Sequence, residues 1–370
     1  MPTQFTGTLN ANEIFAGIYN MIISQQVFAD NVVHKHQLVD RFRVDGSMYG
    51  DTKLYYSTDV LKSSPWGADD EATNLLQIHR PADPKCQKVT INKFRQICLT
   101  VDNYLSKRAW GDEYAFSSFT SVMKGWLADT KEVYENTLFN AFIGTTESAV
   151  GKQTQEVALS AYKDLTDLEA KARLRAQSIA KKLADIFVEL GDYSRDYTDY
   201  QNLRSYNADD FIIIGNASYI NEITYLDLPT IFHTDNLSMK DRMVLLPSRY
   251  FGVPVAVGAQ AVTADGTSIR SLIEQDITTS SGVKHVFAGD LIPSGVEVAS
   301  TSAIIYPAYT EKSDIICKIV HKTSVPFMSA FEAGTSFFNP KSLTETNYLT
   351  FGHSELDRLA NYPFITIYED

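Results

Sequence analysis

One stretch of the chain, residues 111–144, constrains the fold more than any other. Its mostly apolar side chains recur at gaps of three and four, the spacing that places residues on one face of an α-helix. The eight members of this stripe are Phe116, Phe119, Met123, Trp126, Thr130, Tyr134, Leu138 and Phe142. At 1.5 Å per residue the helix is about 45 Å long. It is either a long core helix of an α/β enzyme or a spine that carries other elements at its two ends, and the flanking sequence decides.

The ends and the middle of this stretch carry signals of their own. Asp112 and Glu113 suit a helix N-terminus, which favours negative charge. Gly144 is expected to end the helix in the left-handed conformation. Gly125 costs about 1 kcal/mol relative to Ala, which allows a bend or a break there.

Composition excludes several classes of protein. The 370 residues carry a formal net charge of -12, which argues against a protein whose main task is to grip nucleic acid. The three cysteines, Cys86, Cys98 and Cys317, show no metal-ligand spacing, so we expect free thiols in a reducing compartment. The N-terminus lacks the basic start and apolar run of a signal peptide, and no apolar run is long enough to span a bilayer.

The sequence before the spine predicts an arm and a projecting hairpin. Residues 1–11 indicate an extended arm, and 12–28 a short helix with Asn12 as its N-cap. Residues 52–62 and 87–101 are typical of strands. About two dozen residues separate them, whereas ordinary hairpin loops have about two to five. A hairpin with so elaborate a tip has little core of its own and needs a partner to pack on.

A second amphipathic helix follows the spine and a short β segment at 155–160. Thr166 and Glu169 form a capping-box pattern at its start. Its apolar stripe consists of Leu168, Ala172, Ala176, Ile179, Leu183, Ile186 and Leu190, and Gly191 follows it. The other face carries Lys171, Arg173, Arg175, Lys181 and Lys182, which we interpret as a solvated face rather than a nucleic-acid patch.

The remainder predicts mainly short strands. The apolar run 211–214 suits a strand buried on both faces, and 217–225 a short helix after it. Further strands are expected at 243–246, 253–257, within 297–325 and at 364–368, and the rest of 340–370 is expected to be a mixed tail. No internal repeat or low-complexity tract is visible.

A search for catalytic and ligand motifs predicts no catalytic residue, no cofactor site and no metal site. GxGxxG, GxxxxGK[ST], HExxH and GxSxG patterns are all missing. His34 and His36 would share one face of a strand, but no third metal ligand is proposed by the sequence. The acidic triplet at 69–71 is interpreted as a solvated loop tip. Asp209 and Asp210 precede a buried strand, yet nothing nearby completes an acid–base pair.

The order of these parts resembles a known family. The N-terminal arm, the long hairpin at 51–102, the spine helix at 112–143, the capped helix at 167–190 and the phrase FIIIGNASYINEI at 211–223 follow one another as in the major capsid proteins of tailed bacteriophages. The resemblance implies an α+β fold of the HK97 type. It implies an N-arm at 1–45, an E-loop at 46–105, a P-domain with the spine helix at 106–162, an A-domain at 163–315, and P-domain return strands with a C-terminal tail at 316–370.

The resemblance also implies a function. The expected protein is not an enzyme but a major capsid protein that self-assembles into hexamers and pentamers, forming an icosahedral shell around double-stranded DNA without reading its sequence. Its expected partners are other copies of itself, a separate scaffolding protein, a portal and minor head proteins, with no membrane. The expected location is the virion, after assembly in the host cytoplasm.

Two other interpretations remain open at this point. A cytoplasmic two-domain α/β enzyme would place the helix at 168–190 and the strand at 211–214 in a parallel sheet, which requires regular strand–helix alternation. A tail or adhesion protein of a virion would usually show repeats or long β-rich fibres. We expect the N-arm and the 51–102 hairpin to be mobile in the free subunit.

Overall fold

The computed structural model describes residues 38–46, 50–63, 80–102, 113–158, 162–225, 242–255, 269–300 and 303–370. The expected arm, the helix at 12–28 and most of the hairpin tip therefore lie outside the described residues. The described chain divides into two compact units. The first comprises 94–102, 113–133 and 332–351, and the second comprises all other described residues.

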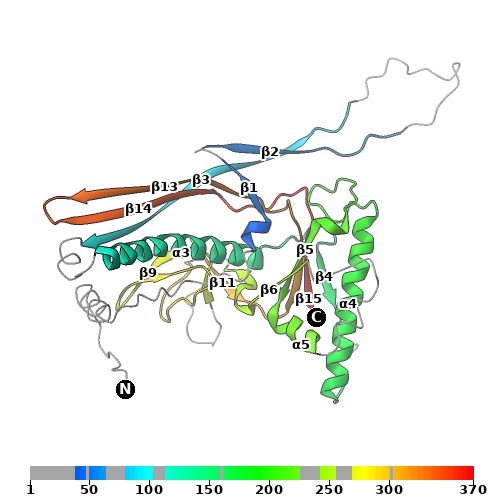
Figure 1. Cartoon of the computed structure of the whole chain (residues 1–370). Coiled ribbons are helices and arrows are strands. Elements are labelled where there is room, and N and C mark those ends of the chain that lie inside the picture. Colours follow the sequence, from blue (N-terminus) through cyan, green and yellow to red (C-terminus); the bar gives the residue numbers. More distant parts are fainter. Residues whose placement is uncertain are drawn as a thin grey trace. The chain divides into compact units, whose positions relative to one another are not determined.

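The helices are few and the strands are many (Figure 1). The helices are α3 (Glu113–Thr145), α4 (Leu168–Gly191) and α5 (Ala217–Tyr225), and the 3-10 turns are η1 (Val39–Arg41), η3 (Ala208–Asp210) and η4 (Ser248–Tyr250). The strands up to the middle of the chain are β1 (Arg43–Asp45), β2 (Thr52–Ser57), β3 (Lys85–Asp102), β4 (Thr154–Val157), β5 (Phe211–Asn216), β6 (Met243–Leu246), β7 (Gly252–Pro254) and β8 (Ile269–Ser271). The later strands are β9 (Gln275–Thr279), β10 (Gly282–Val286), β11 (Ala308–Glu311), β12 (Ile315–His321), β13 (Phe327–Asn339), β14 (Thr344–Ser354) and β15 (Phe364–Glu369).

The second unit is built on a five-stranded sheet in the order β4-β15-β12-β5-β6. β12 runs antiparallel to both β15 and β5, whereas β6 and β4 run parallel to their neighbours. The sheet is therefore mixed, and the all-parallel sheet of the enzyme interpretation is wrong. The predicted strand at 211–214 is confirmed as β5, in which every residue is buried.

Each face of this sheet supports its own core. Phe211 and Ile213 lie in one cluster with Ile179 and Leu183 of α4. Ile212 and Ile214 lie in the other cluster, with Phe139 and Ile143 of α3. Because successive residues of a strand point to opposite faces, the run FIII supplies both cores at once.

The spine helix is confirmed, but its buried side differs from the predicted stripe. α3 continues through Gly125 without a break. Two members of the stripe, Tyr134 and Phe142, are buried or packed against the core, whereas Trp126 is 42% exposed. The part of α3 in the second unit also buries Phe139, Ala141 and Ile143, which the stripe leaves out. The single-face pattern fails because this end of the helix is covered on more than one side. The side chains at 116, 119 and 123 are outside the description.

Gly144 is needed for a reason other than the predicted left-handed exit. It lies inside α3 and is not among the glycines with positive φ. A Cβ placed there would lie 2.0 Å from the carbonyl oxygen of Tyr250. Gly144 therefore allows two backbones to approach closely.

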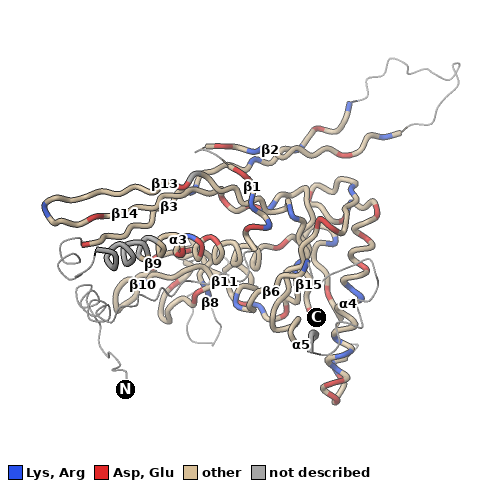
Figure 2. The backbone as a smooth tube through the Cα atoms, viewed as in Figure 1, with Lys and Arg blue, Asp and Glu red and all other residues tan. Residues whose placement is uncertain are grey.

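α4 is confirmed, with three corrections. Its N-cap is Asp167, whose side chain accepts a hydrogen bond from the Glu169 N–H, so the Thr166 capping box is wrong. Leu168, the first residue of the helix, is 81% exposed and does not belong to the buried stripe. Arg175 is not solvated: its guanidinium donates to Glu369 at 2.7 Å and covers the Tyr219 ring at 4.3 Å. The helix carries charges of both signs along its length (Figure 2).

A second five-stranded sheet has the order β1-β13-β14-β3-β2. In the first unit, Thr100 and Thr346 pair across β3 and β14 at 3.1 Å, and the Lys131 ammonium contacts Glu332 at 2.6 Å. β14 corrects the predicted mixed tail at 340–370. Its inward positions include Asn347 and His353, and these polar residues obscure the alternation of an amphipathic strand.

Smaller sheets complete the second unit. β7, β11 and β8 form one in that order, and β9 and β10 form a two-stranded hairpin. The predicted strand within 297–325 is confirmed only from Ala308 onward. Among the described residues, no helix has the length and apolar character needed to span a membrane.

Candidate functional site at the base of the hairpin

The predicted hairpin exists, and its two faces differ. β2 pairs antiparallel with β3, from Thr52 opposite Thr90 to Ser57 opposite Lys85. On the inward face, Val89 and Ile91 are buried in a small cluster with Met328 and Leu359. The hairpin was expected to have little core of its own and to need a partner, and on this face it packs on other segments of the same unit.

The outward face remains open. Leu54 is 51% exposed and Tyr56 is 65% exposed. Their partners across the strand pair are Lys88 and Cys86, and both of these are exposed as well. An apolar pair placed on a sheet edge in this way is a surface that another chain can cover.

The distal end of β2 is fixed to its own unit by hydrogen bonds. The Ser57 hydroxyl lies 2.5 Å from the Asn361 side-chain oxygen and accepts a bond from the Asn202 amide at 2.6 Å. Asp59 accepts bonds from the Arg195 guanidinium at 2.6 Å and from the Leu203 N–H at 3.0 Å. The hairpin is thereby held in place before it enters the segment that is not described.

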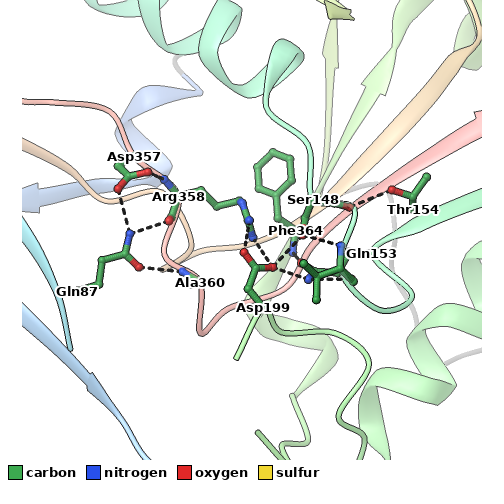
Figure 3. A network of polar contacts seen from close by, with 10 residues as sticks. Gln87, Ser148, Gln153, Thr154, Asp199, Asp357, Arg358, Ala360 and Phe364 are labelled. Carbon is green, nitrogen blue, oxygen red and sulfur yellow. Dashed lines mark hydrogen bonds and ion pairs between the residues drawn. The ribbon is translucent and has the colours of Figure 1, made fainter. Parts of the chain in front are cut away.

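Gln87 performs the same task on β3 (Figure 3). Its amide nitrogen donates to the Asp357 carboxylate at 3.0 Å and to the Arg358 carbonyl at 2.8 Å, and its amide oxygen accepts from the Ala360 N–H at 2.9 Å. One side chain therefore satisfies three polar groups of the segment that leads into β15.

Asp199 is the centre of a polar network beside this contact (Figure 3). The Arg358 guanidinium binds both of its carboxylate oxygens. Ser148 and Gln153 each donate to its Oδ1 at 2.8 Å. The Gln153 side-chain oxygen in turn accepts from the N–H of Phe364 in β15 at 3.2 Å. The network joins the segment after α3, the loop at 199 and the start of β15.

The carboxylates of this region are held in the charged form. Burial raises the pKa of Asp199, but the hydrogen bonds from Arg358, Gln153 and Ser148 outweigh it, so the net pKa is lowered. The hydrogen bond from Arg195 lowers the pKa of Asp59 to about 2, with help from the Leu203 N–H. These groups stabilise a fixed geometry and are not poised for proton transfer near neutral pH.

The residues weighed for chemistry do not come together here. Asp209 binds the Arg242 guanidinium, and its backbone carbonyl accepts from Lys322 at 2.8 Å. His34, His36 and the acidic triplet lie outside the described residues. No group of three or more His, Cys, Asp or Glu in the described part of the chain is arranged to hold a metal ion. The sequence analysis missed Asp199 and Arg358, because they are 159 positions apart and belong to no motif.

Known structures show which class of protein shares this fold. The fold is similar to a chain in the capsid structure of Staphylococcus phage Andhra, with a TM-score of 0.63 and 10% identity over 94% of this chain and 87% of that one. A chain of the native bacteriophage P68 structure that describes the head fiber and inner core protein gives a TM-score of 0.61 and 11% identity, over 93% and 87% of the two chains. A chain of the mature capsid of bacteriophage PhiM1 gives 0.51 and 8%, over 93% and 90%.

The fold is therefore that of a phage capsid protein, of the HK97-like type. The model of the Phi29-like phage major capsid protein family matches residues 5–362, so the chain belongs to that family. A comparison with curated proteins finds no sequence match. The protein is a subunit that forms a capsid shell and is part of the virion, and the enzyme interpretation is not supported.

Proposed function

We propose that the subunits associate as hexamers and pentamers that close into an icosahedral shell around packaged double-stranded DNA. The observation that carries this proposal is the asymmetry of the β2–β3 hairpin. Its inward face and its base are fixed by the unit to which it belongs, while Leu54 and Tyr56 remain exposed. A strand pair with an open apolar face suits repeated contacts with other copies, since each weak contact is multiplied by symmetry.

We propose the following division of the chain. Residues 1–45 form the N-arm, 46–105 the E-loop, and 106–162 the P-domain with its spine helix. The range 163–315 belongs to the A-domain, and 316–370 supplies return strands of the P-domain and the C-terminal tail. The strands β12 and β15 of this last range lie in one sheet with β5 of the A-domain range, so this sheet draws strands from both ranges.

The remaining parts of the proposal concern partners and location. We infer a separate scaffolding protein, a portal and minor head proteins as partners, assembly in the host cytoplasm, and no enzymatic activity. The net charge of -12 supports a container that encloses DNA without gripping it, because like charges repel in bulk.

The test is co-expression of the full chain with a scaffolding protein, followed by electron microscopy. We expect closed shells from the native chain. The double variant Leu54→Ser, Tyr56→Ser is expected to remain as unassembled subunits with an unchanged denaturation midpoint, since it removes exposed side chains only. Leu168→Ser, which alters an apolar side chain 81% exposed on α4, is the matched control and is expected to assemble.

Closed shells from the double variant at native yield would contradict the proposed role of the hairpin face. Closed shells from the native chain expressed alone would contradict the need for a scaffold. Mobility of the N-arm and of the 51–102 hairpin in the free subunit stays a prediction, and strong hydrogen-exchange protection of both in a lone subunit would contradict it.

A further inference from the structure

Lys318 occupies an unusual position for a lysine. It lies in β12, the middle strand of the central sheet, and none of its surface is exposed. Its neighbours across the sheet are Ile214 and Thr366. Lysine is almost never fully buried without a charged partner. Among the described residues, no carboxylate lies within ion-pair distance of its ammonium.

The partner of Lys318 is the end of the spine helix. Its Nζ donates to the carbonyl oxygen of Thr146 at 2.7 Å. Thr146 directly follows α3, and its N–H makes a helical hydrogen bond to the Phe142 carbonyl at 2.9 Å. The last carbonyls of a helix lack helical partners and carry partial negative charge, which a cation stabilises. Lys318, a residue of the middle strand β12, therefore caps the C-terminal end of α3.

The groups around this contact are few and defined. The Lys318 ammonium lies 5.6 Å from the centre of the Phe364 ring. Glu147 favours the ammonium electrostatically, and its carboxylate accepts a hydrogen bond from the Tyr368 hydroxyl. Lys312 covers the Tyr368 ring at 4.2 Å and pairs with Asp314 at 3.2 Å.

In these surroundings Lys318 can lose its proton near neutral pH. Burial lowers the pKa of Lys318 to about 7, Glu147 opposes this shift, and Lys312 adds to it. The side chain therefore changes from ammonium to neutral amine across the neutral range. Because the pKa is lowered, the cost of burying the ammonium exceeds what the Thr146 carbonyl and the helix end contribute, so the folded chain favours the neutral amine, which still reaches this carbonyl.

We propose that Lys318 makes the contact between the C-terminal end of the spine helix and the central sheet sensitive to pH: its ammonium, fully buried and bonded to the Thr146 carbonyl, favours opening of this joint, and removal of the proton tightens it. The joint consists of Thr146, Glu147, Lys318, Phe364 and Tyr368. It gives the subunit a pH-dependent element that is independent of the hairpin and of contacts between copies.

The test is hydrogen exchange read by mass spectrometry on peptides that cover 138–150, in unassembled full-length chain, from about pH 6 to about pH 8.5 and corrected for intrinsic exchange rates. In the native chain we expect protection to rise by up to about tenfold over this range, because opening exposes Lys318 to water, where it binds its proton more strongly. Lys318→Gln is expected to remove the pH dependence. Lys322→Gln is the matched control, because Lys322 also donates to a backbone carbonyl but is exposed. It is expected to keep the native pH dependence.

A second variant keeps Lys318 in place. Glu147→Gln removes the carboxylate that favours the ammonium but can still accept from Tyr368, so the midpoint of the pH dependence is expected to move to lower pH. If Lys318→Gln does not fold, the pH midpoint of protection in Glu147→Gln tests the proposal on its own. Equal protection of the native chain at both pH values, or a midpoint that Glu147→Gln leaves unmoved, would overturn the proposal.

Discussion

The central sheet and the β2–β3 hairpin are both built from β-strands, but they differ in how far their side chains are buried within one subunit. In the sheet, every residue of β5 and β12 is buried. In β2, exposed and half-buried residues alternate, and only Ser57 is buried. The sheet completes its core within one chain, whereas the hairpin completes one face and leaves the other open. A shell subunit needs both, because it must fold alone and then bind its copies.

The contacts that join the hairpin to the unit containing the central sheet are polar. Gln87, Ser57 and Asp59 fix the hairpin through directional hydrogen bonds rather than through a large apolar contact. Hydrogen bonds specify one geometry, because they weaken steeply when distance or angle changes. The hairpin can thereby be held in one orientation while its outward side chains remain available. The four predictions that follow test this division, from the largest expected effect to the smallest.

Of the four changes, Gly144→Ala is expected to lower the free energy of unfolding most, because it acts in the buried part of the fold. The new Cβ would lie 2.0 Å from the Tyr250 carbonyl oxygen, and neither backbone can give way cheaply. We expect a loss of more than about 4 kcal/mol in the free energy of unfolding, measured by denaturant titration of unassembled subunits. Gly125→Ala in the same helix is the control. A Cβ there meets nothing within 4 Å, so that variant is expected to gain about 0.5–1 kcal/mol. A small loss in the free energy of unfolding for Gly144→Ala would mean that the backbones at Gly144 and Tyr250 can move apart to admit a methyl group.

Phe211→Ala and Tyr56→Ala compare the two regions directly. Phe211 is fully buried, with edge contacts to Phe187 and to His321 at ring distances of 6.0 and 5.3 Å. Its truncation is expected to cost about 3–5 kcal/mol in the free energy of unfolding. Truncation of Tyr56 is expected to change it by less than about 0.5 kcal/mol. Comparable losses in the two variants, measured on unassembled subunits, would refute the division between a closed and an open region.

Asp199→Asn tests the polar boundary and its dependence on pH. The folded-state pKa of Asp199 is lowered, so its contribution to stability is present above the unfolded pKa of about 4 and is lost as pH falls through the folded value. We expect the variant to be about 2 kcal/mol less stable at neutral pH. The difference should narrow below about pH 4.

The measurement is the denaturant midpoint as a function of pH, with Asp164→Asn as the control. Asp164 is exposed in a turn, so its variant is expected to match the native chain within about 0.5 kcal/mol. A constant difference between Asp199→Asn and the native chain from neutral to acidic pH would show that the charge of Asp199 does not contribute to stability.

The sequence predicts elements with strong local patterns and misses what depends on distant partners. The spine, α4, β5, α5 and both strands of the hairpin follow from spacing and residue type, and they are confirmed. The network of Asp199 and Arg358 could not be predicted, because its members are brought together only by the folded sheet. β14 was hidden because Asn347 and His353 occupy inward positions, and a period-two search counts such residues as outward. The predicted stripe of α3 holds at Tyr134 but misses Phe139 and Ile143, because a helix covered on several sides has no single stripe.

The start of α4 yields the smallest and most local prediction. Two residues can cap this helix by pattern, but only Asp167 does so, with its side chain 3.1 Å from the Glu169 N–H. Asp167→Ala is expected to cost about 1 kcal/mol in the free energy of unfolding, because it leaves this N–H without a protein partner and removes negative charge from the helix N-terminus. Thr166→Ala is expected to leave stability unchanged within about 0.5 kcal/mol. Denaturant titration of both variants separates the two caps, and a larger loss at Thr166 would restore the capping box.

α4 covers one face of the buried sheet, while its own start is exposed. A small loss in the free energy of unfolding for Asp167→Ala beside a large loss for Phe211→Ala would therefore show that this sheet draws its stability from packing rather than from the helix end.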